Sequence, residues 1–295
     1  MITEIFYNVD NFCQTFINKW NKNLLPNLEI KQQNSRMLIS EIMTIVIFYH
    51  SSGYKCFKYF YLNHIIQNYK SHFPKIVSYN RFIELMPKTI VPLLYFLKYN
   101  RMSECTGISY IDSTKIAVCN NRRISSNKVF KNIAKRGKTS MGFFYGFKVH
   151  LIVNHKGDLI SFSITTGNKS DKNKSLVSKM CEDLFGKLFG DKGYISNPLR
   201  YDLKNKDIQL ITKLNSNMKN KLINLTDKIL LNKRGVIETI NDQLKNICNI
   251  EHSRHRSVFN FFVNLISGLI AYTFLPNKPS IRLSVAETNL LVDYT

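Results

Sequence analysis

The sequence predicts an α/β protein in which an all-helical region precedes a mixed five-stranded sheet with helices on both faces. Apolar residues recur at helical spacing over the first hundred residues, and β-branched and aromatic runs begin near residue 106. Helical and strand patterns then alternate. At 295 residues the chain has room for one large domain and a smaller region. We expect a helical region over 1–104, the sheet domain over 105–275 and a C-terminal tail over 276–295.

Helices are expected in the first region because apolar residues repeat at three- and four-residue spacing in segments 39–46 and 90–97. Between them, segment 73–82 has a proline break, then Ser78 as a candidate helix N-cap, then an aromatic and basic helix start. This pattern suits a helix-turn-helix unit that binds DNA. A packed helical domain with a basic surface explains it equally well.

Three strands, at 108–118, 143–153 and 159–165, are predicted from β-branched and aromatic runs, with a hairpin turn at 155–158. The following patterns predict helix 173–185, strand 188–191, helix 198–205, strand 208–212 and helix 234–249. Three antiparallel strands followed by this alternation are the layout of a ribonuclease-H-like domain.

The charge balance indicates a polyanionic partner. The chain carries 42 Lys and Arg against 20 Asp and Glu, for a net charge of +22. Nucleic acid is the commonest partner of such an excess, although a membrane surface, or a basic protein with no polyanion, fits composition alone. An insertion over 120–140 has no acidic residue and seven cations, for which we expect DNA contact, with a solubilising loop as the alternative: Arg122, Arg123, Lys128, Lys131, Lys135, Arg136 and Lys138.

Cysteine usage and hydropathy point to a cytoplasmic protein. The six cysteines are widely spaced, with no C-x-x-C pair, which favours reduced thiols over disulfides or a zinc site. No secretory signal is expected at the N-terminus. The apolar segment 257–275 carries a polar stripe, Asn260, Asn264 and Ser267, so we expect a helix packed on a core and no membrane association.

Three acidic residues stand where strands or helices would present them to one point. Asp112 lies in an apolar strand, where an unpartnered carboxylate is costly. Asp191 closes a strand between glycines, and Glu238 is on the last helix of the predicted sheet domain. Taken singly, Asp112 could cap a turn, Asp191 could be an ordinary loop residue, and Glu238 could pair with Arg234 four residues earlier.

The same stretches resemble the three catalytic motifs of bacterial insertion-sequence DDE transposases. The motifs are YIDST at 110–114, GDKGY at 190–194, and Arg234, Glu238 and Lys245 at the spacing R-x3-E-x6-K. Segments 144–150 and 252–257 resemble in particular the nine-eighty-two family of insertion sequences. Neighbouring families have a tyrosine where this chain has Leu231, so no argument can rest on an aromatic ring there.

The resemblance implies a ribonuclease-H-like core whose Asp112, Asp191 and Glu238 bind two Mg²⁺ ions, with Mn²⁺ as a substitute. Such a pair activates a water against the scissile phosphate and stabilises the leaving 3′ oxygen. The implied partners are double-stranded DNA, namely terminal inverted repeats and target DNA. Arg234 and Lys245 would hold phosphates, and we expect Arg254 and Arg256 to do so as well, although a solvated helix end explains that pair nearly as well.

Two alternatives stay open: a nuclease of the same fold that cleaves without joining, and a DNA-binding relative of a transposase that has lost catalysis. Transposition requires two ends to be brought together, so we expect a homodimer on DNA in a bacterial cytosol, associated with the nucleoid. Asp171 also follows a strand and could be mistaken for a metal ligand. We expect it to cap the next helix instead.

Overall fold

The computed structural model describes residues 1–23, 36–140, 142–213, 224–251, 255–282 and 287, and these belong to two compact units. Unit 1 contains residues 1–101 and 243–275, and unit 2 contains residues 102–242 and 276–295. Segment 243–275, expected to belong to the sheet domain, thus packs with the N-terminal helices, and the division falls inside one helix, α10. Each unit is described by itself.

Unit 1 is helical, as the spacing of its apolar residues predicts. Its helices are α1 (Ile2–Asn23), α2 (Ile39–Ser51), α3 (Phe57–Phe60), η2 (Tyr61–Ile65), α4 (Ile66–Asn68), α5 (Tyr79–Leu85), η3 (Met86–Thr89), α6 (Ile90–Phe96), η4 (Leu97–Arg101) and α11 (Val258–Thr273). The predicted cap is confirmed, since the Ser78 side chain accepts a hydrogen bond from the backbone N–H of Arg81. The predicted helix-turn-helix function stays a prediction.

Helix α11 is the apolar segment that hydropathy singled out. It packs against α2, α6, η3 and η4, and most of its residues are buried there, as predicted. Its polar stripe is used in part, because the Asn260 side chain donates to the backbone carbonyl of Ile83. No helix in the described part of the chain is both long and apolar enough to cross a membrane.

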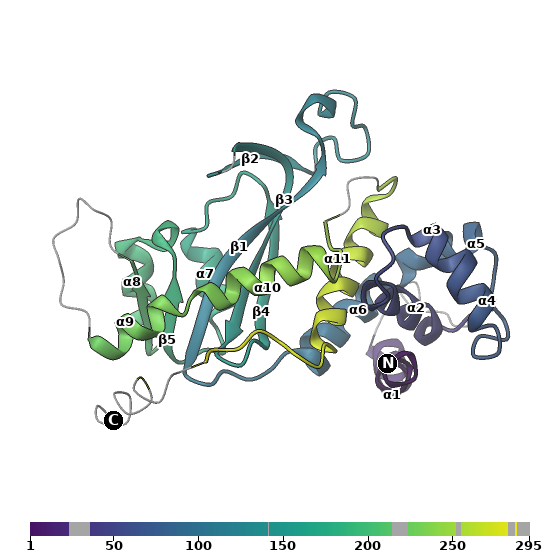
Figure 1. Cartoon of the computed structure of the whole chain (residues 1–295), viewed down its shortest axis with the longest axis horizontal. Coiled ribbons are helices and arrows are strands. Elements are labelled where there is room, and N and C mark those ends of the chain that lie inside the picture. The colour runs from purple at the N-terminus through teal and green to yellow at the C-terminus, as the bar shows by residue number, and fades with distance from the viewer. Residues whose placement is uncertain (24–35, 141, 214–223, 252–254, 283–286, 288–295) are drawn as a thin grey trace. The chain divides into compact units, whose positions relative to one another are not determined.

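Unit 2 is built on a mixed six-stranded sheet (Figure 1). The strands are β1 (Ile108–Cys119), β2 (Lys135–Thr139), β3 (Gly142–Asn154), β4 (Leu159–Thr166), β5 (Gly186–Gly190) and β6 (Ile208–Thr212). Strand β3 pairs antiparallel with β1 along one edge and with β2 and β4 along the other, whereas β5 runs parallel to β1 and β6. The predicted mixed sheet is confirmed.

One strand, β2, lies in the basic insertion, where no strand was predicted. Its sequence KRGKT has no strand-forming pattern of its own. It forms because the first five residues of β3 offer unpaired backbone groups, and β2 pairs with them from Lys135 opposite Gly146 to Thr139 opposite Gly142. The rest of the insertion contains a short helical turn, η5 (Asn121–Arg123).

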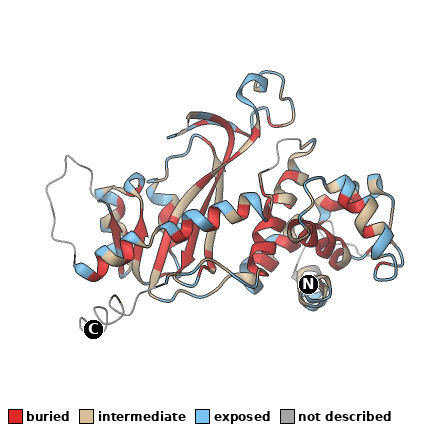
Figure 2. Cartoon of the chain, viewed as in Figure 1, coloured by how far each residue is buried: buried red, intermediate tan, exposed pale blue. Residues whose placement is uncertain are grey.

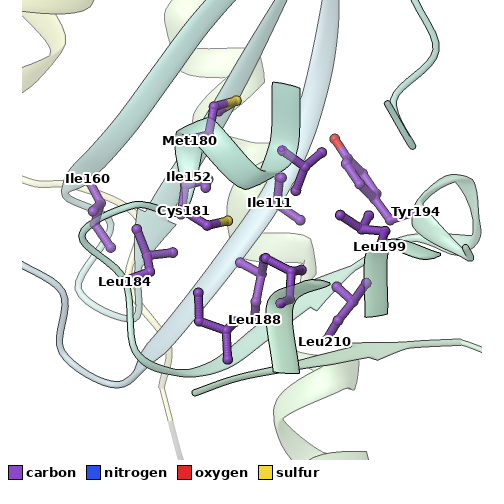
Figure 3. Close-up of a cluster of buried hydrophobic side chains, with 13 residues drawn as sticks. Ile111, Ile152, Ile160, Met180, Cys181, Leu184, Leu188, Tyr194, Leu199 and Leu210 are labelled. Carbon is purple, nitrogen blue, oxygen red and sulfur yellow. The ribbon is translucent and has the colours of Figure 1, made fainter. Parts of the chain in front are cut away.

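Helices cover both faces of the sheet. On one face, α7 (Lys174–Met180) and α8 (Asn197–Lys204) bury an apolar cluster with strand residues that include Ile111 and Ile152 (Figure 3). Side chains alternate between faces along a strand, so the neighbours of Ile111 point the other way. Tyr110 does so, donating its hydroxyl to the carbonyl of Leu230 in α9 (Leu225–Asn232), which precedes α10 (Gly235–Asn246).

Three details differ from the prediction. The helix expected over 173–185 ends at Met180, and α9 was not predicted. Ile247, inside the helix predicted over 234–249 and at helical spacing from the buried Ile237, Ile240 and Leu244, follows the end of α10 and is 48% exposed. Burial along α10 alternates between its two faces in Figure 2. A helical stripe therefore predicts burial only as far as the helix itself extends.

Candidate active site

Asp112 points away from the apolar cluster, toward the face covered by α10. Its Oδ2 accepts a hydrogen bond of 2.9 Å from the side-chain amide of Asn241 on that helix. Burial raises the pKa of Asp112 to about 6, opposed by the backbone N–H of Ser113 and the charge of Arg234. The charges of Asp191 and Glu238 raise the pKa further, so both of the other predicted acids lie close enough to act on Asp112.

Asp191 is brought beside Asp112 by the pairing of their strands. Strand β5 runs parallel to β1 with Phe189 opposite Tyr110, and continuing that register by two residues places Asp191 next to Asp112. Asp191 caps the short helix η6 (Lys192–Tyr194), where its Oδ1 accepts a 2.8 Å hydrogen bond from the backbone N–H of Gly193. A Cβ at Gly193 would lie 2.9 Å from that oxygen, so a larger residue there would displace the Asp191 carboxylate from this hydrogen bond.

Glu238 lies on the first turns of α10 and forms an ion pair with Arg234. This is the pairing that the sequence left open as the ordinary explanation for Glu238. The side chain of Glu238 is 59% exposed, while that of Arg234 is only 17% exposed. Arg234 therefore connects two of the acids, since it binds Glu238 directly and its charge lowers the pKa of Asp112.

The three carboxylates are neighbours without forming a closed set of metal ligands. Within the described residues, no three Asp, Glu, His or Cys side chains are arranged closely enough to hold a metal ion. The chemistry nevertheless fits a hard divalent cation, because the groups are carboxylate oxygens, which Mg²⁺ prefers. The amide Oδ1 atom of Asn241, beside Asp112, is a further hard oxygen ligand, and it is buried with no hydrogen-bond partner among the described residues. A cation here would also relieve the repulsion among the acids.

Asp171 belongs to a polar network on the other side of β1, which the sequence reading missed. Its carboxylate accepts from the hydroxyl of Ser113 at 2.7 Å and from the Lys148 ammonium at 3.0 and 3.2 Å, and His150 lies 3.9 Å away. The predicted role as a helix cap is wrong, because Asn173 caps α7. Lys148 was the available signal, since a lysine in the apolar strand β3 needs a counterion.

The cations of the insertion are all exposed, as a DNA-contacting surface requires: Arg122, Arg123, Lys128, Lys131, Lys135, Arg136 and Lys138. Lys245, assigned to a phosphate by its motif position, pairs with Glu251 at 3.3 Å in unit 1. Arg256 is exposed, and Arg254 lies outside the described residues. Leu231, where neighbouring families have tyrosine, is buried in α9.

Known proteins provide an independent comparison. A family model described as a transposase DDE domain matches residues 102–258, more than half of the chain. The chain is also similar in fold to the cryo-EM structure of a piggyBac transposase in a synaptic complex with hairpin DNA. The TM-score is 0.51 at 12% sequence identity, covering 92% of this chain and 70% of that one. No curated protein matches the sequence.

The matched range includes Asp112, Asp191 and Glu238 and the whole sheet. The narrower resemblance to one family of bacterial insertion sequences stays a prediction. On the match to the family model, supported by the fold, this chain belongs to the DDE transposase family.

Proposed function

We propose that the protein cleaves DNA at the ends of a mobile element and joins the freed 3′ ends to target DNA, using Asp112, Asp191 and Glu238 as its catalytic carboxylates. The observation that carries this proposal is the placement of the three acids. They come from a central strand, the end of the adjacent parallel strand and the helix that crosses above. Burial raises the pKa of Asp112, and the charges of the other two acids raise it further.

Two Mg²⁺ ions bound by these acids would supply an activated oxygen nucleophile and stabilise the oxygen that leaves the phosphate. The chain's own groups prepare the site. The Asn241 amide orients Asp112, the Gly193 N–H orients Asp191, and Arg234 holds Glu238. Glu238 is exposed on a helix, so a change of rotamer can turn it from Arg234 toward Asp112 when a cation enters. Arg234, released from Glu238, is then free to bind a phosphate.

DNA as the substrate agrees with the net charge of +22 and with the exposed basic insertion. The similar piggyBac structure is a synaptic complex with hairpin DNA. Two ends must be joined in one reaction, so we propose a homodimer on end DNA. A particle mass corresponding to one chain per bound end complex would contradict the dimer.

A strand-transfer assay tests the function. The DNA would be duplexes ending in the inverted repeats that flank the gene, pre-cut at the 3′ end and mixed with target plasmid and Mg²⁺. We expect joined products that disappear with a chelator and with Asp191→Asn, while Asp183→Asn, an exposed acid of the same unit, remains active.

The other outcomes distinguish the alternatives. Metal-dependent cleavage of uncut ends without joined product would identify a nuclease. End binding with neither cleavage nor joining in Mg²⁺ or Mn²⁺ would identify a DNA-binding protein without catalysis. Either result would overturn the proposal.

A further inference from the structure

Beside the acids, unit 2 contains a cavity of about 660 Å³ whose wall is strongly basic. The wall includes six cations and a single carboxylate, Asp171, which is already paired with Lys148. The other five are Arg136, Lys138, Lys169, Lys172 and Lys192. All five are exposed, so their charges are available to a ligand that enters from solvent. The ligand must therefore be an anion with more than one charge.

The cavity is built where three segments meet closely. A Cβ at Gly137 of β2 would lie 2.2 Å from the carbonyl oxygen of Gly167, so only glycine lets strand β2 approach the loop after β4. The backbone N–H of Gly167 donates to Gly146 of β3 at 2.9 Å, which holds this loop against the sheet. Arg136 and Lys138, which stand on β2, are thus held against this loop.

Residues of the cavity wall are neighbours in the chain of the proposed catalytic acids. Lys192 and Gly193 line the cavity and directly follow Asp191. Asp171 lines it as well, and accepts a hydrogen bond from Ser113, the residue after Asp112. The cavity therefore adjoins the proposed site of cleavage at Gly193, whose N–H binds Asp191, whereas Asp171 and Ser113 lie across β1 from Asp112.

One exposed aromatic ring in the cavity wall favours a nucleic acid with an unpaired base as the ligand. Phe143 is 51% exposed, and the Arg136 guanidinium lies 4.5 Å and the Lys138 ammonium 5.6 Å from its ring centroid. An exposed aromatic ring flanked by cations is the arrangement on which proteins stack unpaired bases. A volume of about 660 Å³ is in the range of pockets that hold a small molecule, which suits one base with its neighbouring phosphates.

From these observations we infer that the cavity binds a short single-stranded segment of the DNA substrate, with one unpaired base stacked on Phe143 and the adjoining phosphates on the surrounding lysines. This inference rests on the proposed function, and it adds that the DNA beside the cleavage site is unpaired when bound. The lysines recognise the backbone without regard to sequence, and Phe143 accepts any base.

The test uses a short single-stranded oligonucleotide that contains 2-aminopurine, in chelator so that no cleavage occurs. We expect quenching of 2-aminopurine on binding to the full-length wild type. Phe143→Ala should reverse the quenching and weaken the affinity for the single strand about 5- to 100-fold, while Phe143→Trp should retain both. Phe185→Ala is the matched control, because Phe185 is exposed to a similar extent, 55%.

The phosphate contacts are tested by salt dependence. The double variant Lys169→Gln and Lys172→Gln should lower the slope of log affinity against log salt by about 1 to 1.5 for the single strand. Lys156→Gln, an exposed lysine in the β3–β4 turn, should leave the slope unchanged. An unchanged single-strand affinity of Phe143→Ala, or an equal loss for single strand and duplex, would overturn the inference.

Failure of this inference is distinguishable from failure of the proposed function. Strand transfer by wild type with binding that is insensitive to Phe143 would remove the inference alone. Base stacking on Phe143 in a protein that shows no strand transfer would instead remove the proposed function.

Discussion

The side chains of Asp112, in β1, and Asp171 lie on opposite faces of that strand, but their surroundings differ in one decisive respect. Asp171 has a full countercharge in Lys148 and a hydroxyl donor in Ser113. Asp112 has a neutral amide, that of Asn241. Burial and the charges of two further acids oppose its ionisation, and the charge of Arg234 offsets them only in part. A carboxylate with its own lysine supports the fold, whereas a buried one beside other carboxylates would be stabilised in its charged form by a bound cation.

The largest expected difference between the two carboxylates is in catalysis. Asp112→Asn keeps the size of the side chain and removes its charge, so it should lower metal-dependent strand transfer by about a thousandfold or more. Unfolding monitored in chelator should show that the variant is at least as stable as wild type, because a repelled, buried charge has been removed. Substantial activity in Asp112→Asn would show that Asp112 is not a metal ligand.

Stability should respond in the opposite way at Asp171. Asp171→Asn leaves the buried Lys148 without a countercharge, so the free energy of unfolding in chelator should fall by about 2–3 kcal/mol. The double variant Lys148→Met with Asp171→Asn should lose less than the sum of the single losses in a denaturant titration. Asp183→Asn, at an exposed position, is the control. Additive losses would mean that the Lys148–Asp171 pair is not the source of the effect.

A smaller effect is expected in the pH dependence of stability. The pKa of Asp112 rises from 3.8 to about 6 on folding, so the folded state binds the proton more tightly. Its stabilising contribution is present below about pH 4 and is lost as the pH rises through about 6. Wild type in chelator should thus lose about 2 kcal/mol relative to Asp112→Asn between pH 4 and pH 7. A difference that stays flat across this range would contradict the raised pKa.

Much of the fold follows from local patterns that the sequence carries by itself. The runs that predict strands at 108–118, 143–153 and 159–165 match β1, β3 and β4 within two residues at each end. The Ser78 cap and the burial of α11 were predicted in the same way. These features depend on side-chain periodicity and on hydrogen bonds between residues three or four apart, which are written into short segments of chain.

The three acids and the pairing of Glu238 with Arg234 could be named from the sequence, but the partner of Asp112 could not. Only the folded chain decides that Asn241 bonds to Asp112 and that Asp171 belongs to Lys148. Strand β2 likewise exists through its pairing with β3, and the basic cavity exists because Gly137 and Gly167 let their backbones approach. The physical reason is the separation along the chain over which each interaction acts. Local propensity acts over a few residues, whereas these contacts join residues far apart in sequence, and only the close packing of the folded chain brings them within hydrogen-bonding distance.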